Sequence, residues 1–240
     1  MMKKINTAAV VLKSLNYRDS DKIYTLFSKD FGKISVIARG VRKISSRRGG
    51  SMDTLNLVKV GLSETKGGMR QLDEVLVLNS FGKLKDVYNL STKCSYIAEL
   101  VHKTTEEGEN ARDLFELLVK FLKIAQKFPE NIDLALRYFE IHYLELMGYG
   151  FDNEVCSKCK NPLNLSEGEF YLDVAHGSFV CNACGSYGPV FSHRAVKTLR
   201  DLKANKLTKT DSEVLKELEN ITFALIDNHL DIKIKSRELI

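Results

Sequence analysis

Four cysteines arranged as two pairs are the residues best suited to chemistry. Cys156 and Cys159 form one Cys-x-x-Cys pair, and Cys181 and Cys184 form a second pair 21 residues further on. Two residues between paired cysteines allow a tight turn to direct both thiolates at one point. Two such turns complete the tetrahedral shell that Zn²⁺ prefers with thiolate sulfur. We therefore expect these four residues to bind one structural zinc ion per chain.

The segment between the cysteine pairs supports this interpretation. Two short strand-like runs, 169–173 and 178–180, are joined at His176-Gly177, which is the layout of a zinc ribbon. Two disulfides would require an oxidising compartment, and a thioredoxin-like redox pair would require an α/β setting. A catalytic zinc needs an open coordination position, which four thiolates would close. Cys94 stands alone on a helical stripe and is interpreted as a packing residue.

A second cluster is basic. Five cations, Arg39, Arg42, Lys43, Arg47 and Arg48, fall within ten residues between the third and fourth predicted strands. Arginine matches phosphate oxygens in bidentate fashion, and the neighbouring Ser and Gly residues allow close approach of the backbone to a polyanion. These five residues are the predicted contacts with nucleic acid. The alternative is that they form an ordinary solvated face.

Aromatic residues lie near this basic segment, on the predicted strands and turns of the same region. They are Tyr17, Tyr24, Phe27 and Phe31. Outward rings would stack on nucleic-acid bases, whereas inward rings would belong to the core of a small barrel. The sequence leaves both interpretations open.

The distribution of charge agrees with a polyanion-binding N-terminal part. Residues 1–80 carry 15 cationic and 7 acidic side chains, for a net charge of +8, whereas residues 81–240 carry 21 and 24, for −3. Such an asymmetry favours a nucleic-acid-binding face on one module.

The elements that must position these residues change in period near Phe81. Five strand-like runs, 7–14, 22–28, 33–42, 54–64 and 69–80, suit a small closed barrel of the OB type, with an SH3-like barrel as the alternative. From there the apolar period becomes that of helices. One stripe contains Leu84, Val87, Tyr88, Ile97, Ala98 and Val101; a clearer one runs from Leu114 to Phe128.

Later helices are predicted at 131–148, 193–204 and 211–228. The first is apolar on nearly all sides and is expected at the centre of a bundle, while the last follows Thr210-Asp211-Ser212-Glu213, which has capping-box spacing. The fold class is therefore α+β and multidomain. The predicted domains are an OB-fold DNA-binding domain at 1–81, a helical domain at 82–150 and 191–240, and a zinc-ribbon insertion at 151–190.

Motifs of catalysis are not found. The sequence has no Walker phosphate-binding loop, no Gly-x-Gly-x-x-Gly, no His-Glu-x-x-His and no Gly-x-Ser-x-Gly. We also find no signal peptide and no apolar run of membrane-spanning length. The sequence thus predicts a cytoplasmic, nucleoid-associated protein that is not an enzyme.

Several features, in order, resemble the bacterial DNA repair protein family RecO. These are the opening run Ala9 to Lys22, the run Thr25 to Lys43, the helical middle, the four-cysteine segment and the ending Lys233 to Leu239. The resemblance spans the whole chain. It supports the zinc role of Cys156, Cys159, Cys181 and Cys184, and DNA contact by Arg39, Arg42 and Lys43; Arg47 and Arg48 are added from their charge.

The resemblance implies a recombination mediator. Such a protein binds single- and double-stranded DNA, anneals complementary strands, and binds the acidic C-terminal tail of single-stranded DNA-binding protein (SSB). With RecR it helps to load RecA onto SSB-coated single strands. Residues Lys233, Lys235 and Arg237 are candidates for the rim of the tail-binding pocket. The alternative is a zinc-ribbon and OB-fold module that binds RNA or another protein.

Overall fold

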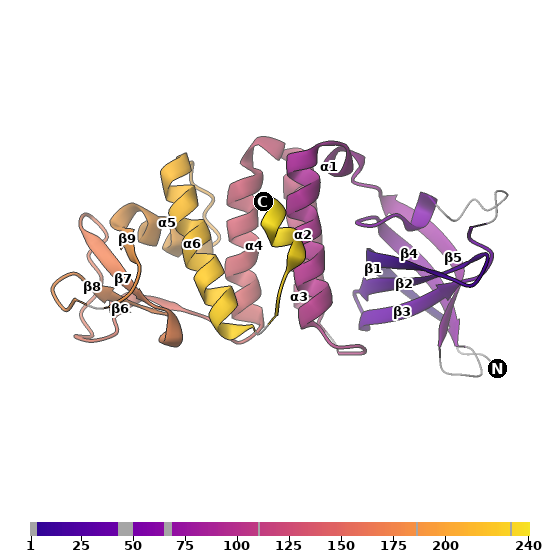
Figure 1. Ribbon diagram of the computed structural model, residues 1–240, viewed down its shortest axis with the longest axis horizontal. Coiled ribbons are helices and arrows are strands. Elements are labelled where there is room, and N and C mark those ends of the chain that lie inside the picture. Colours follow the sequence, from indigo (N-terminus) through magenta and orange to yellow (C-terminus); the bar gives the residue numbers. More distant parts are fainter. Residues whose placement is uncertain (1–3, 43–49, 65–68, 110, 186, 231) are drawn as a thin grey trace. The chain divides into compact units, whose positions relative to one another are not determined.

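The computed structural model describes residues 4–42, 50–64, 69–109, 111–185, 187–230 and 232–240. Its contacts divide the chain into two compact units (Figure 1). Unit 1 comprises residues 1–129 and 234–240, and unit 2 comprises residues 130–233. The helices are thus shared between the units, with the first three beside the barrel and the later ones beside the cysteine segment. The predicted three-part division is a different partition and stays a prediction.

Unit 1 is built on a closed five-stranded barrel with the strand order β1-β2-β3-β5-β4. The sequence therefore predicted the barrel correctly, and the parallel pairing of β3 with β5 is the closure of the OB type. Its strands are β1 (Lys4–Tyr17), β2 (Asp21–Ser28), β3 (Gly32–Ala38), β4 (Leu57–Glu64) and β5 (Arg70–Asn79).

Alternating side chains fill the barrel. Tyr24, Leu26, Ile34, Val36 and Val60 are at most 1% exposed and lie in one apolar cluster. Because side chains alternate across a strand, the neighbours of these residues point outward. Strand β3 ends at Ala38, four residues earlier than predicted, because Gly40 turns the chain with a φ of +65° and its N–H donates to Asp21.

Three helices accompany the barrel in unit 1. They are α1 (Gly82–Asp86), α2 (Tyr88–Thr104) and α3 (Arg112–Lys127), and the C-terminal 3₁₀ helix η4 (Lys235–Leu239) packs on α2 (Figure 1). Phe115 of α3 contacts Phe27 of β2, with 6.5 Å between the ring centroids. Helix α3 therefore covers the part of the outer barrel surface around Phe27.

The first predicted helical stripe is wrong at two positions. Leu84, Ile97 and Val101 are buried as expected, but Val87 is 50% and Tyr88 is 71% exposed. Val87 has extended backbone angles between α1 and α2. Since the chain bends there, the buried faces of the two helices are not in register, and one continuous apolar stripe cannot run through both.

Unit 2 contains three helices, α4 (Ile132–Leu146), α5 (His193–Lys203) and α6 (Ser212–His229). Helix α4 contacts both α5 and α6, which also contact each other, so its place at the centre of a bundle stays a prediction. Its buried side chains include Arg137 and Glu140, a pair that the apolar pattern did not predict. The capping box was misplaced by one residue, because the N-cap of α6 is Asp211, whose carboxylate accepts from Val214 N–H at 3.0 Å.

The cysteine segment of unit 2 forms a four-stranded sheet with the order β6-β8-β7-β9. The strands are β6 (Asp152–Cys156), β7 (Glu169–Asp173), β8 (Ser178–Cys181) and β9 (Val190–Ser192). Strands β7 and β8 form the predicted hairpin, which turns through Gly177 at a φ of +55°. Among the described residues of both units, every helix is too short or too polar to cross a lipid bilayer.

Candidate metal centre and nucleic-acid interface

The structure brings the four predicted metal ligands together in unit 2. The sulfur atoms of Cys156, Cys159, Cys181 and Cys184 all lie within 4.8 Å of one another. Cys156 is buried, whereas Cys159 is exposed. The cysteines come from the ends of β6 and β8 and from the turns that follow these strands, so the sheet fixes the spacing of the two pairs.

Each cysteine pair sits on the same kind of turn. Lys160 N–H donates to Cys156 O at 2.9 Å, and Gly185 N–H donates to Cys181 O at 3.2 Å. Both residues that follow the second cysteine have left-handed backbone angles, with φ +62° for Lys160 and +56° for Gly185. The turns therefore fold back over the sulfur atoms, and Cys181 N–H points at Cys156 Sγ at 3.4 Å.

These turns change the acidity of the thiols. Burial alone would raise the pKa of Cys156, but hydrogen bonds from the backbone N–H groups of Cys159, Cys181 and Lys158 outweigh it and lower the pKa to about 6. The thiols of Cys181 and Cys159, which crowd Cys184, raise its pKa to about 12. A cluster of four thiols, one of which ionises easily, is suited to binding a cation. A bound cation would favour the thiolate form of the other three cysteines as well.

The spacing of the sulfur atoms fits a tetrahedral metal ion. A Zn–S bond of about 2.3 Å implies about 3.8 Å between neighbouring sulfurs of a tetrahedron. The Cys159 and Cys181 sulfurs are 3.9 Å apart. The four cysteines could therefore hold a metal ion, and four sulfur ligands would leave no open position for a substrate.

A second candidate site lies on the outside of the barrel in unit 1. Cross-strand partners share one face of a sheet, so the outward row Lys13, Thr25 and Ser35 is followed by the row Leu15, Ile23 and Ile37, of which Ile37 is buried. Leu15 is 62% exposed, and Lys13 is exposed. We call this surface the open face, defined by Lys13, Leu15, Tyr17, Ile23, Thr25 and Ser35.

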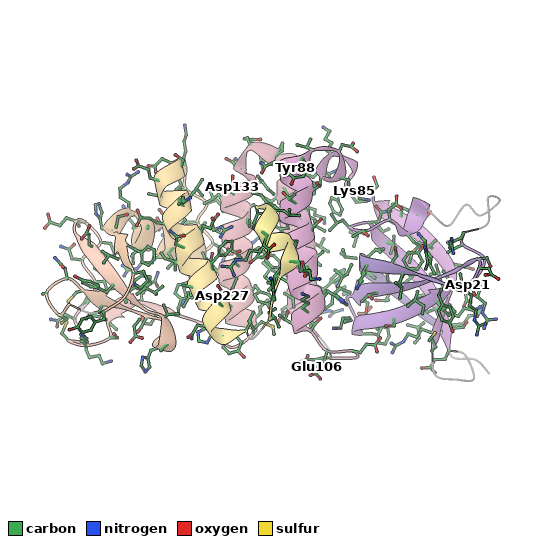
Figure 2. All side chains as sticks on the ribbon, viewed as in Figure 1. Asp21, Lys85, Tyr88, Glu106, Asp133 and Asp227 are labelled. Carbon is green, nitrogen blue, oxygen red and sulfur yellow. The ribbon has the colours of Figure 1, made fainter. Side chains whose placement is uncertain are left out.

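Cations border one end of the open face. Arg39 and Arg42 are both exposed and lie just beyond β3, near the β1–β2 turn, where Figure 2 labels Asp21. The base of this segment is held by Gly40 N–H, which donates to Asp21 at 2.8 Å, and by Arg42 N–H, which donates to Ser20 O at 3.0 Å. These arginines lie beside a barrel surface on which Lys13 and Leu15 are exposed, a position suited to contact with a polyanion.

Comparison with known proteins then decides the family. The chain matches the family models "Recombination protein O N terminal" over residues 2–81 and "Recombination protein O C terminal" over residues 87–238. The chain belongs to the RecO family. The first match ends just after β5, so the barrel corresponds to the N-terminal part of the family.

Curated RecO proteins from several bacteria are similar over most of their length. The "DNA repair protein RecO" of Syntrophus aciditrophicus is 28% identical over 98% of this chain and 94% of its own. The proteins of the same name from Clostridium acetobutylicum and Anaeromyxobacter sp. strain K are 32% and 29% identical, over 78% and 100% of this chain and 74% and 96% of their own. The family is one of DNA repair, and neither family model describes a catalytic domain.

Within this RecO chain, the predicted DNA contacts are only partly placed. Arg39 and Arg42 are exposed beside the open face, whereas Lys43, Arg47 and Arg48 lie outside the described residues. The open face was not among the sites predicted from the sequence. The alternation of Lys13, Leu15 and Tyr17 in β1 was the available signal, but the predicted strand ended at residue 14.

Two of the four candidate stacking rings belong to the interior. Tyr24 is 1% exposed because it points into the barrel, and Phe27 is 0% exposed because α3 covers it. Neither ring can stack on a base. Tyr17 is half-buried on the open face, with the Arg18 guanidinium 5.2 Å from its centroid, and Phe31 is half-buried with Arg70 at 5.8 Å.

His142 has structural contacts, and the fifth cysteine has the packing role expected of it. His142 contacts Glu145 at 3.1 Å and the Leu202 carbonyl at 3.2 Å. Cys94 is fully buried, and burial raises its pKa to about 12. It therefore stays protonated and packs as an apolar side chain.

Proposed function

We propose that this chain is a DNA-binding recombination mediator that anneals complementary single strands and, with RecR, helps to load RecA onto SSB-coated DNA. Membership of the RecO family supports the repair role. The observation that carries DNA binding is the open face with exposed Arg39 and Arg42 at its end. Work on chromosomal DNA would take place in the cytoplasm, at the nucleoid.

The proposed mechanism of annealing is charge neutralisation. Two complementary strands repel each other through their phosphates, and cationic side chains that contact both strands lower this barrier and release counterions. Leu15, Tyr17 and Ile23 on the open face offer apolar contact for unstacked bases between the phosphate contacts. Neither step needs nucleotide hydrolysis or an active site, so we propose no enzymatic activity for this chain.

The test is binding of labelled oligo(dT) over a series of salt concentrations, followed by strand annealing. Converting Arg39, Arg42, Lys43, Arg47 and Arg48 together to Ala should weaken binding and make the salt dependence shallower by about 0.7 in log–log slope per lost phosphate contact. Lys59→Gln, an exposed charge on β4, is the control. Unchanged annealing by the five-residue variant would contradict the proposal, and an RNA strand in the same assay tests the RNA-binding alternative.

We propose a structural Zn²⁺ ion for the cysteine cluster, with Cys156, Cys159, Cys181 and Cys184 as ligands. The support is the set of four sulfur atoms within 4.8 Å and the paired turns that direct them inward. When bound, the ion would cross-link β6 and β8 and supply no reaction chemistry.

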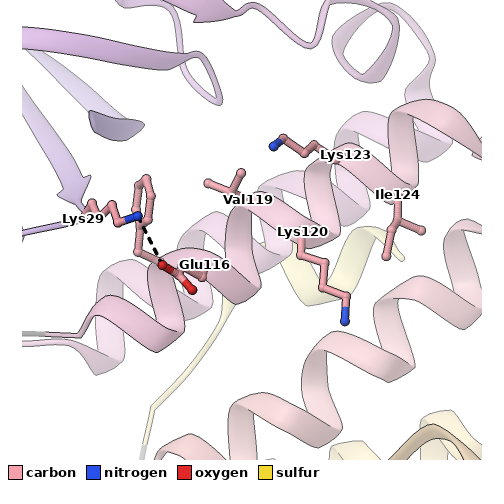
Figure 3. A pocket seen from close by; sticks show the side chains of 7 residues that line it. Lys29, Glu116, Val119, Lys120, Lys123 and Ile124 are labelled. Carbon is pink, nitrogen blue, oxygen red and sulfur yellow. Dashed lines mark ion pairs between the residues drawn. The ribbon is translucent and has the colours of Figure 1, made fainter. Parts of the chain in front are cut away.

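We also propose a binding pocket for the acidic tail of SSB, which ends in Phe. A pocket of about 490 Å³ lies along α3 in unit 1, where Lys29 and Glu116 form an ion pair of 3.3 Å (Figure 3). Its apolar lining is Phe115, Val119 and Ile124, and its cations are Lys29, Lys120 and Lys123. An apolar floor with a lysine rim suits a carboxylate-rich peptide with a terminal ring.

The rim predicted from the sequence is different, since none of Lys233, Lys235 and Arg237 lines this pocket. Binding of a fluorescent acidic peptide ending in Phe tests the α3 pocket. Val119→Asp should abolish binding and Lys123→Gln should weaken it about three- to tenfold, whereas Lys127→Gln on the same helix should leave it unchanged. Full affinity of Val119→Asp would refute this pocket without affecting the DNA-binding proposal.

A further inference from the structure

A second group of cations lies in unit 1, where β3 approaches the C-terminal end of α2. Lys13 of β1 and Lys33 of β3 come from the outer surface of the barrel, and His102 and Lys103 lie in the last turn of α2. Lys33 Nζ donates to the His102 carbonyl at 2.8 Å, which joins strand and helix directly. Figure 2 labels Glu106 just beyond this end of α2, and Asp21 at the opposite end of the barrel.

Register places this group in line with the open face. Lys33 is two residues from Ser35 in β3, so both lie on the outer side of the strand, and Arg39 follows directly after the last residue of the strand, Ala38. At about 3.3 Å per residue, the five steps of β3 from Lys33 to Ala38, the residue before Arg39, span about 17 Å. The open face therefore has cations at both ends, with Leu15, Tyr17 and Ile23 between them.

Carboxylates of the described residues do not fully balance the positive charge at the α2 end. Among the residues that the structure describes, no carboxylate lies within ion-pair distance of Lys13 or Lys33. Glu99 pairs with Lys103 at 2.8 Å and also accepts from Lys235 N–H and Ser236 N–H. The backbone of Glu107 forms an isolated β-bridge with that of Lys33, and the residue Glu107 is exposed.

The surroundings of His102 show the same excess of positive charge. Its Nδ1 atom is buried and has no hydrogen-bond partner in the described part of the chain. Burial lowers the pKa of His102, and the charges of Lys33, Lys13 and Lys103 lower it further, against a smaller opposing effect of Glu99. The imidazole is thus held neutral beside several ammonium groups, in a place where an anion would be stabilised.

We propose that Lys13, Lys33 and His102 form a phosphate-binding subsite for the backbone of a single strand that lies along the open face. An ammonium group has three donors, so Lys33 can bind a phosphate oxygen while it holds the His102 carbonyl. The inference rests on the proposed DNA-binding function and adds a second contact for the same strand, at the end of the face opposite Arg39.

The first test is the salt dependence of oligo(dT) binding by the full chain. Lys13→Gln/Lys33→Gln should make the log–log slope shallower by about 1.4, because two phosphate contacts are lost at about 0.7 each. Lys59→Gln, which removes a lysine from the outer surface of β4, should leave the slope unchanged. An unchanged slope in the double variant would overturn the subsite.

The second test uses the wild-type chain, so folding of a variant does not affect it. Histidine NMR titrations with and without saturating oligo(dT) should show that the pKa of His102 rises on binding, since a phosphate offsets the lysine charges. His176, which is exposed on unit 2, serves as the control in the same spectra, and His102→Gln assigns the signal. An unchanged His102 pKa in the saturated complex would refute the subsite.

The two proposals fail in different ways. If the wild-type chain does not bind oligo(dT), both are wrong. If binding depends on Arg39 and Arg42 but neither on Lys13 nor on Lys33, the DNA-binding face stands and the subsite is wrong.

Discussion

The ion pair of Arg137 and Glu140 in α4 allows a sharp prediction, because it is almost completely removed from water. The two side chains are 2% and 0% exposed, and Arg137 Nη1 is 2.9 Å from Glu140 Oε2. Thr222 of α6 accepts from Arg137 at 3.0 Å and donates to Glu140 at 2.6 Å. The network therefore joins two helices of unit 2 through charged groups.

Glu140→Gln removes the charge with little change of shape. Arg137 would keep the Thr222 hydroxyl, the Glu219 carboxylate 3.7 Å away and the Phe223 ring 4.9 Å from its guanidinium carbon, and none of these matches a buried carboxylate as a counter-charge. Removing one partner of a buried pair costs about 3 to 5 kcal/mol, because the other charge stays desolvated. We expect a loss of that size in the free energy of unfolding of unit 2.

Urea denaturation followed by circular dichroism and tyrosine fluorescence, fitted to separate transitions for the two units, measures this loss. The control is Glu213→Gln, an exposed carboxylate at the start of α6, which should cost less than about 1 kcal/mol. The double variant Arg137→Met/Glu140→Leu should lie within about 1 kcal/mol of the wild type, because well-packed apolar residues can replace a buried pair. If Glu140→Gln costs under 1 kcal/mol, or if the double variant is as unstable as the single one, the reasoning is wrong.

Three further predictions concern other parts of the chain. Metal analysis should find one Zn²⁺ per chain. Cys159→Ser should lower both the zinc content and Tm, whereas the control Cys94→Ala should keep the zinc. Full zinc occupancy in Cys159→Ser would refute the proposed set of ligands. Burial would raise the pKa of Glu99, but hydrogen bonds from Lys103, Ser236 and Lys235 outweigh it and lower the pKa from 4.5 to about 2. The contribution of the Glu99 carboxylate to stability is therefore complete above about pH 4.5 and is lost as the pH falls towards 2. Glu99→Gln should therefore destabilise unit 1 by about 1 to 2 kcal/mol at pH 7 and by little at pH 2, as measured by urea denaturation at both pH values, and an equal loss at both would contradict the assignment. Asp211→Ala should lower the free energy of unfolding by about 1 kcal/mol, because the N-cap of α6 is lost, whereas Thr210→Ala should change it little. If thermal melts show Thr210→Ala to be the more destabilising substitution, Thr210 is the N-cap.

Local signals made much of this architecture predictable. The cysteine pairs specify their own turns, so their convergence follows from spacing within short segments. The barrel strands were recognised because residues such as Ile34 and Val36 alternate with Lys33 and Ser35. The basic segment was found by charge alone, which explains why the sequence could name Arg39 and Arg42 but not the surface beside them.

Long-range packing decided what the sequence could not show. Arg137 and Glu140 lie three residues apart in an apolar helix, and only the approach of Thr222, 82 residues after Glu140, makes their burial tolerable. The α3 pocket and the cluster around His102 are likewise each lined by residues of a helix and of a strand or turn that is distant in sequence. Phe27 shows the same limit, because α3 covers a ring that the strand directs outward.

The last residues of the chain belong to the part that carries the barrel. Glu99 of α2 accepts hydrogen bonds from Lys235 and Ser236, and residues 234–240 group with residues 1–129 although about a hundred residues of unit 2 lie between them. Neither unit can therefore be isolated by a single cut. A stop codon after residue 233 would remove an α2 contact from unit 1 and leave unit 2 intact, and an affinity tag is better placed at the N-terminus than beside this anchored end.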